Sequence, residues 1–135
     1  MAAAGLITVA SNHGPKETVN RLEAAVKAKG MTVFARIDHA AGAAEAGMSL
    51  RPTELLIVGN AKAGTPLMQA TPTIGIDLPL KALVWQDPAG ATWLSYNDPS
   101  WLVQRHGTGG DGLEATVDAM AAALDAVARA ATAAQ

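Results

Sequence analysis

The sequence predicts an α+β fold, in which a single antiparallel-rich sheet carries two main helices on one face in the order β-α-β(4)-α, with short connecting helices. Three patterns indicate this. Residues 80–85 and 91–96 read as strands joined by Gln86-Asp87-Pro88-Ala89-Gly90, where Pro and Gly suit a tight turn. Apolar residues recur at four- and three-residue spacing from Leu113 to Val127, as in an amphipathic helix. Gly14-Pro15 opens another helix, since Pro is favoured at the first helical position.

The N-terminal quarter of the chain predicts a strand, a helix and a second strand. Residues 6–10 form the first strand, and the helix that begins at Pro15 ends at Gly30, a residue typical of helix C-termini. Residues 31–37 alternate as the second strand. Met31, Val33, Ala35 and Ile37 are expected on one face, and Thr32, Phe34 and Arg36 on the other.

The middle of the chain predicts short helices around one buried strand. Residues 38–50 contain a short helix that Arg51-Pro52 ends. Residues 55–58 are continuously apolar, which is typical of a strand that is central or covered on both faces. Thr65 is expected to cap a short helix over residues 66–70.

The remaining segments complete one domain over residues 1–135. Asp98-Pro99 starts a short helix that ends near Gly107, and Asp111 with Glu114 predicts the cap of the terminal helix. We expect residues 130–135 to be a frayed tail.

Composition excludes several classes of protein. The 135 residues carry a formal charge of −2 and no basic stripe, so we expect no nucleic-acid partner. The chain has no cysteine, which excludes disulfides and thiolate chemistry, and no cofactor is expected. The apolar start is too short to cross a membrane and lacks the basic stretch of a signal peptide, so the expected location is cytoplasmic, with no membrane partner. Only 16% of residues are charged, which favours a surface covered by a second subunit.

The loop from Gly59 to Thr65 is the first candidate site. It resembles a phosphate-binding loop, but Thr65 and Pro66 occupy the positions where that loop needs Lys and then Ser or Thr. A weaker hypothesis is that Asn60, Lys62 and Thr65 hold a small anion at a helix start. The alternative is that the loop only turns the chain.

Asp38 and His39 are the second candidate, because a carboxylate beside an imidazole forms a general base. Adjacent strand residues point in opposite directions, so the two side chains need not meet, and the favoured alternative is a surface role or a cap for the following short helix. The other histidines, His13 and His106, show no metal-ligand spacing, and no metal site is predicted.

Asp77 and Tyr96 complete the candidate set, because each lies near the start or end of a predicted strand. Their structural alternatives are a turn residue for Asp77 and an amphipathic sheet residue for Tyr96.

Five short segments together resemble the family known as domain of unknown function 302. They are Phe34-Ala35-Arg36-Ile37-Asp38-His39, Pro52-Thr53-Glu54-Leu55, Gly59-Asn60 with Gly64-Thr65 and Leu67-Met68, Asp77-Leu78-Pro79-Leu80-Lys81, and Tyr96-Asn97-Asp98-Pro99. The resemblance covers about residues 31–101, and it departs from the family at Ala61, where Pro is common. It implies a fold like that of half a TATA-binding protein and small prokaryotic proteins that are often homodimers. It supplies no activity, cofactor or catalytic residue.

The hypothesis from the sequence is a small-molecule-binding or sensory module that acts as a homodimer. A small anionic or apolar ligand would lie between the sheet and the helices, with all seven candidate residues along a common rim. They are Asp38, His39, Asn60, Lys62, Thr65, Asp77 and Tyr96. Two alternatives stay open: an enzyme with His39 as general base, and a structural protein that serves assembly.

Overall fold

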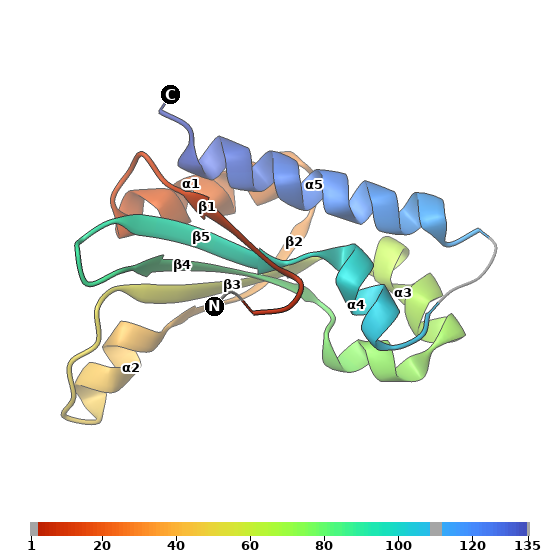
Figure 1. The fold of residues 1–135 in the computed structure, drawn as a ribbon, viewed down its shortest axis with the longest axis horizontal. Coiled ribbons are helices and arrows are strands. Elements are labelled where there is room, and N and C mark those ends of the chain that lie inside the picture. The colour runs from red at the N-terminus through yellow and green to blue at the C-terminus, as the bar shows by residue number, and fades with distance from the viewer. Residues whose placement is uncertain (1–2, 109–111, 135) are drawn as a thin grey trace.

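One antiparallel sheet forms the base on which the helices pack, in a computed structural model that describes residues 3–108 and 112–134 (Figure 1). The helices α1 and α5 lie together on one side of the sheet, and α3 and α4 gather near one end of α5. The elements are β1 Leu6–Ala10, α1 Pro15–Ala28, β2 Thr32–Asp38, α2 His39–Glu45, β3 Thr53–Gly59, α3 Ala61–Ala70, the 3₁₀ turn η1 Pro72–Ile76, β4 Leu80–Gln86, β5 Thr92–Asn97, α4 Pro99–Arg105 and α5 Glu114–Thr132. The predicted fold class and element order are confirmed.

The strand order is β1-β5-β4-β3-β2, so β4 is the middle of the five strands among the described residues. The predicted hairpin of β4 and β5 is present, with Trp85 directly opposite Trp93. Gly90 has a φ of 91°, which is why its turn needs glycine. The first and last strands in this order, β1 and β2, form the two edges of the sheet.

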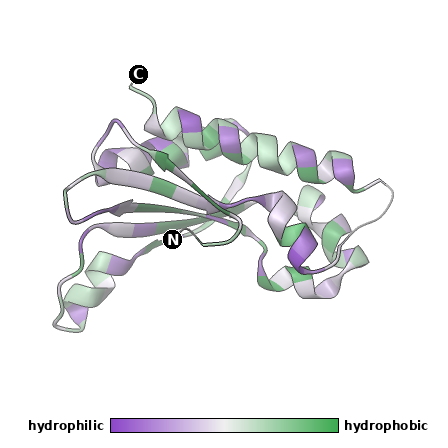
Figure 2. Ribbon diagram, in the orientation of Figure 1, coloured by the Kyte–Doolittle hydropathy of each residue, from purple (hydrophilic) through white to green (hydrophobic). Residues whose placement is uncertain are grey.

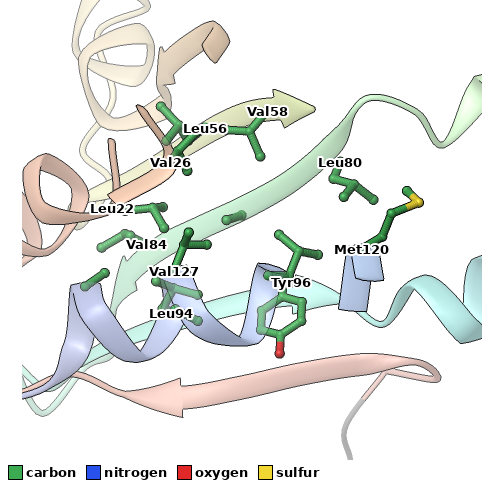
Figure 3. Close-up of a cluster of buried hydrophobic side chains, with 14 of the residues drawn as sticks. Leu22, Val26, Leu56, Val58, Leu80, Val84, Leu94, Tyr96, Met120 and Val127 are labelled. Atoms are coloured by element: carbon green, nitrogen blue, oxygen red, sulfur yellow. The ribbon is translucent and has the colours of Figure 1, made fainter. Parts of the chain in front are cut away.

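The core lies between the sheet and the pair α1 and α5 (Figure 3). The predicted stripe of α5 is buried at Val117, Met120, Leu124 and Val127, and the helix packs against α1, α4 and the strands β1 and β5. Figure 2 shows hydrophobic and hydrophilic residues alternating along α5, as an amphipathic helix requires. The largest fully buried side chains include Leu22, Leu56, Leu94 and Leu124, each at most 1% exposed.

A bulge in β2 makes the predicted alternation wrong after Val33. The pairing with β3 shifts between Val33 and Ala35, which places Arg36 on the helix side of the sheet. There the Arg36 guanidinium contacts the carboxylate of Glu23 on α1 at 2.9 Å and also that of Glu54. Ile37 lies on the other side and is 39% exposed. A single extra residue therefore exchanges the faces of the second half of the strand.

The face of the sheet away from α1 and α5 is apolar. On β3, Leu56 and Val58 are buried beneath the helices, while the alternating residues Leu55 and Ile57 point to the opposite side and are only partly buried. The strand is an interior one, paired with β2 and β4, which agrees with the first of the two predicted alternatives. One of its faces is covered within the chain.

The end of α5 is packed, so the predicted fraying of residues 130–135 is wrong for residues 130–132, which belong to the helix. Ala131 and Thr132 are at most 4% exposed. The side chain of Asn12 donates to the Thr132 carbonyl at 2.9 Å, and that of His13 contacts the Ala133 carbonyl at 2.6 Å. The predicted cap residue Asp111 lies outside the described residues, and Leu113 occupies the position before the first turn of α5.

Candidate functional site

A cavity of about 510 Å³ lies between α3 and α5 at the end of the sheet where β3 ends and β4 begins. We call it the α3–α5 cavity. Its walls come from Phe34 of β2, the start of β4, the first two turns of α3 and the N-terminal half of α5. Its volume falls within the range of about 300–1,000 Å³ that is typical of small-molecule sites.

The walls of the α3–α5 cavity are largely aliphatic. Met31, Met68, Leu78, Pro79, Leu80 and Met120 contribute apolar surface, and Ala63, Ala119 and Ala123 leave room beside them. Methionine side chains adapt readily to ligands of different shape. The interior of the cavity therefore suits an apolar molecule.

The charge at the cavity is positive. Lys29, just after α1, and Lys62, in the first turn of α3, both line it and are exposed. Among the described residues that line it, no Asp or Glu is present. The remaining polar side chains are those of Asn60, Thr65 and Thr116. A negatively charged group would be attracted to this edge of the cavity.

Three of the candidate residues lie at the start of α3. Asn60 caps the helix, because its Oδ1 accepts the backbone N–H of Lys62 at 2.8 Å. The helix therefore begins at Ala61, four residues before the predicted cap, and the prediction that Thr65 is the cap residue is wrong. Asn60 has the extended backbone conformation of a cap residue and caps the helix in place of Thr65. Pro66 consequently lies inside the helix. Asn60, Lys62 and Thr65 all line the cavity.

Asp38 and His39 lie at the opposite end of β3 from this cavity. Asp38 pairs with Glu54 at one end of the β2–β3 ladder and Thr32 pairs with Gly59 at the other. The distance along β3 from Glu54 to Gly59 is about 17 Å. The Asp38 carboxylate caps α2 by accepting the Ala41 N–H at 2.9 Å. The common rim predicted for all the candidates is therefore wrong, and the capping alternative for Asp38 is confirmed.

Asp77 joins two elements at the far side of α3. Its carboxylate contacts Arg105 and His106 of the α4 end at 2.6 and 2.5 Å, and the other ring nitrogen of His106 contacts the Thr73 hydroxyl at 3.1 Å. Burial by itself would raise the pKa of Asp77, but the hydrogen bonds from His106 and Arg105 outweigh it and lower this pKa. These residues do not line the α3–α5 cavity. The cluster fastens η1 to α4.

Tyr96 is part of the core and not of the cavity lining. It is 4% exposed and packs among the buried side chains of the sheet (Figure 3). Burial raises the pKa of its hydroxyl, and the charges of Asp125 and Asp98 raise it further. Of the amphipathic and the ligand-binding interpretations, its position favours the first.

Several cavity residues were not predicted from the sequence. Phe34 and Met120 read there as strand and core residues, and the spacing of the segments gives no signal that they meet. Lys29 follows a helix end, where a lysine is common for its charge alone. Among the residues that the structure describes, no group of three or more His, Cys, Asp or Glu side chains could hold a metal ion. No helix in residues 3–108 and 112–134 is long and apolar enough for a membrane span.

Two longer proteins are similar to most of this chain. A protein of Brucella suis biovar 1 (strain 1330) named fluoride-specific ion channel FluC 1 is 56% identical over 105 residues, which make up 78% of this chain and 41% of that protein. A protein of the same name from Brucella abortus biovar 1 (strain 9-941) has the same identity over 105 residues and is covered to 39%. The chain thus spans about two fifths of the length of these curated relatives.

A solved structure and a family comparison agree on the fold. The crystal structure of an uncharacterized conserved protein DUF302 from Bacillus stearothermophilus matches with a TM-score of 0.82 and 25% identity, covering 96% of this chain and 99% of that one. The family described as domain of unknown function DUF302 matches residues 7–131, a longer range than the 31–101 on which the resemblance rested. The chain belongs to the DUF302 family.

Proposed function

We propose that this protein is a small-molecule-binding or sensory module whose ligand occupies the α3–α5 cavity. The observation that carries the proposal is the combination of aliphatic walls with two exposed lysines at the edge and no carboxylate among the described lining residues. A purely polar ligand would leave the walls unused, and a cation would be repelled by Lys29 and Lys62. The ligand class is therefore an apolar chain or ring system that ends in an anionic group.

The two parts of such a ligand contribute differently. Each CH₂ transferred from water to the aliphatic walls is worth about 0.8 kcal/mol, or about fourfold in affinity. A carboxylate beside exposed Lys62 contributes only about 1 kcal/mol or less, and salt weakens that contribution. The chain of the ligand thus supplies most of the affinity, and the charge supplies orientation.

A homologous series of straight-chain carboxylates tests the proposal by calorimetry. From hexanoate to decanoate, affinity is expected to rise about fourfold per carbon until the cavity is filled. Decanol should bind less tightly than decanoate, and decylammonium should bind least because of Lys29 and Lys62. No chain-length dependence, or equal affinity for the three head groups, would contradict this ligand class.

Variants of the cavity wall locate the binding. Ala123→Trp fills space next to Met120 and should weaken decanoate binding at least tenfold. Ala122→Trp is the matched control, because Ala122 is exposed on the same helix and does not line the cavity. Equal effects of the two variants would place the ligand elsewhere.

The longer relatives support the sensory part of the proposal. They are named fluoride-specific ion channels, and the matched part is only about two fifths of their length. In a chain that joins such a module to a channel, a small ligand bound by the module can shift the channel between its states. Fluoride itself belongs in the calorimetric series, against chloride at equal ionic strength. Binding of fluoride by Lys62 and the start of α3 would identify the anion as the ligand.

The proposed function includes action as a homodimer. The enzyme alternative requires His39 to act as base on a substrate held by Lys62, yet the two residues lie near opposite ends of β3. The Asp38 carboxylate is also engaged in capping α2. These residues cannot reach one substrate together.

A further inference from the structure

We infer that the ligand of the α3–α5 cavity carries a flat aromatic ring beside its anionic group, and that Phe34 is the residue that selects this ring. The inference rests on the proposed function, since it concerns the same cavity. It decides between an apolar chain and a ring system, both of which the aliphatic walls would accept.

The bulge in β2 sets the direction of the Phe34 side chain. The pairing with β3 shifts between Val33 and Ala35, which leaves Phe34 without a partner of its own on β3. A bulge re-aims a side chain, and bulges are frequent beside functional sites. The side chain that this bulge re-aims lines the α3–α5 cavity. The irregularity of β2 therefore supplies the cavity with an aromatic ring.

The ring of Phe34 is held in place and yet is largely uncovered. A Cβ built on Gly59 would lie 3.5 Å from Cε2 of Phe34 and 3.3 Å from Cβ of Pro79, so the ring lies close to the end of β3. Phe34 is nevertheless 53% exposed. A single exposed apolar side chain is ordinary on a protein surface, but this one belongs to the lining of an apolar cavity. A ligand that covers the ring removes it from water, which is favourable.

The sulfur atoms of the cavity favour an aromatic ligand over an aliphatic one. Three of the five methionines of the chain, Met31, Met68 and Met120, line it, and they come from the start of β2, from α3 and from α5. Thioether sulfur makes favourable contacts with the edges of aromatic rings. An alkyl chain gains only the burial of apolar area, whereas a ring gains these contacts and a stack on Phe34 in addition.

The depth of the lining residues places the ring next to the anionic group. Met120 and Leu80, which Figure 3 shows in the core, are at most 9% exposed and form the deep end of the cavity. Lys29 and Lys62 are exposed and mark its outer end, as Phe34 does. A carboxylate near the lysines therefore has Phe34 at the same depth. The ligand class is an arene carboxylate, with its charge attached at or near the ring.

Calorimetry with a flat acid and its saturated analogue tests the choice of ring. Wild type is expected to bind 2-naphthoate about threefold to tenfold more tightly than decahydro-2-naphthoate, because only the flat ring stacks on Phe34. Phe34→Leu keeps an apolar side chain and should remove this preference. Ile37→Leu is the matched control, since Ile37 is exposed on the same strand and does not line the cavity, so the preference should remain.

The saturated acid has at least as much apolar surface as the flat one, so walls that recognise area alone would bind it equally or better. Equal or tighter binding of the saturated acid by wild type, or an unchanged preference in Phe34→Leu, overturns the inference. Decanoate binding without any preference for the flat ring would leave the proposed function standing. If decanoate and both ring acids fail to bind, the proposed function and this inference are overturned together.

A second measurement detects the stack on Phe34 directly. Phe34 is the single phenylalanine of the chain, so labelling with 4-fluorophenylalanine gives one fluorine resonance. Saturating 2-naphthoate should shift this resonance through its ring current, and decahydro-2-naphthoate and decanoate should shift it less. A shift by 2-naphthoate no larger than that by the saturated acid would show that no aromatic ring lies on Phe34, even if both acids bind.

Discussion

Gly64 allows stability and ligand binding to be changed in opposite directions by one methyl group. It lies inside α3, is buried and lines the α3–α5 cavity. A Cβ built there would lie 3.6 Å from the Leu78 side chain and 3.8 Å from that of Met68, which are ordinary contacts. Replacing a helical glycine by alanine is worth about 0.5–1 kcal/mol, so Gly64→Ala should raise the free energy of unfolding by about 1 kcal/mol.

The expected rise in melting temperature is about 3–5 °C for a chain of this size. The same methyl group takes space between Leu78 and Met68, so decanoate affinity should fall about fivefold to tenfold. Gly42→Ala is the matched control, since Gly42 is also helical but a Cβ there meets nothing within 4 Å. It should gain similar stability and leave binding unchanged. The reasoning is refuted if Gly64→Ala lowers the melting temperature or binds decanoate as wild type does.

Four further predictions follow from single contacts. Lys62→Glu should weaken decanoate binding about fivefold at low salt and less in 0.5 M NaCl, as calorimetry at two salt concentrations would show; equal loss at both would exclude a charge effect. Gly5→Ala should cost about 2–5 kcal/mol in chemical denaturation, because Gly5 has a φ of 73° and a Cβ would lie 2.3 Å from Trp101; a loss below 1 kcal/mol would argue against this contact. Deleting residues 130–135 should cost about 2–4 kcal/mol, whereas a frayed tail would cost nothing measurable. Asp77→Asn should cost about 1–3 kcal/mol at pH 7; because the pKa of Asp77 is lowered by folding, the wild-type advantage is present above the ordinary value of 3.8 and disappears as pH falls below it, so urea unfolding curves that differ equally at pH 7 and pH 3 would contradict the assignment.

Local chemistry made much of the fold predictable. The hairpin turn, the stripe of α5 and the cap at Asp98 each depend on residues close in sequence, and the Asp98 carboxylate does accept the Ser100 N–H at 3.0 Å. The bulge in β2 was not predictable, because alternation gives no signal for one extra residue.

Of the cavity lining, only the part contributed by the loop after β3 was predictable from the sequence. Asn60 and Lys62 were identified because they follow a buried strand, and the structure places both at the cavity. Asp38 also lies at the end of a strand, but β2 and β3 are antiparallel, so the last residue of β2 lies beside the first residues of β3 and far from Asn60. The meeting of Asp77 with His106 depends on packing between segments 29 residues apart, which single-sequence patterns do not report.

Backbone amide spectra of ¹⁵N-labelled protein titrated with decanoate test the central claim most directly. The account predicts that the largest shifts occur at Lys62, Gly64 and Met68 on α3 and at Met120 and Ala123 on α5. Residues around His39 and His106 should not move. Shifts that instead gather at either histidine, or no saturable shift with any carboxylate of the series, would contradict a ligand site between α3 and α5.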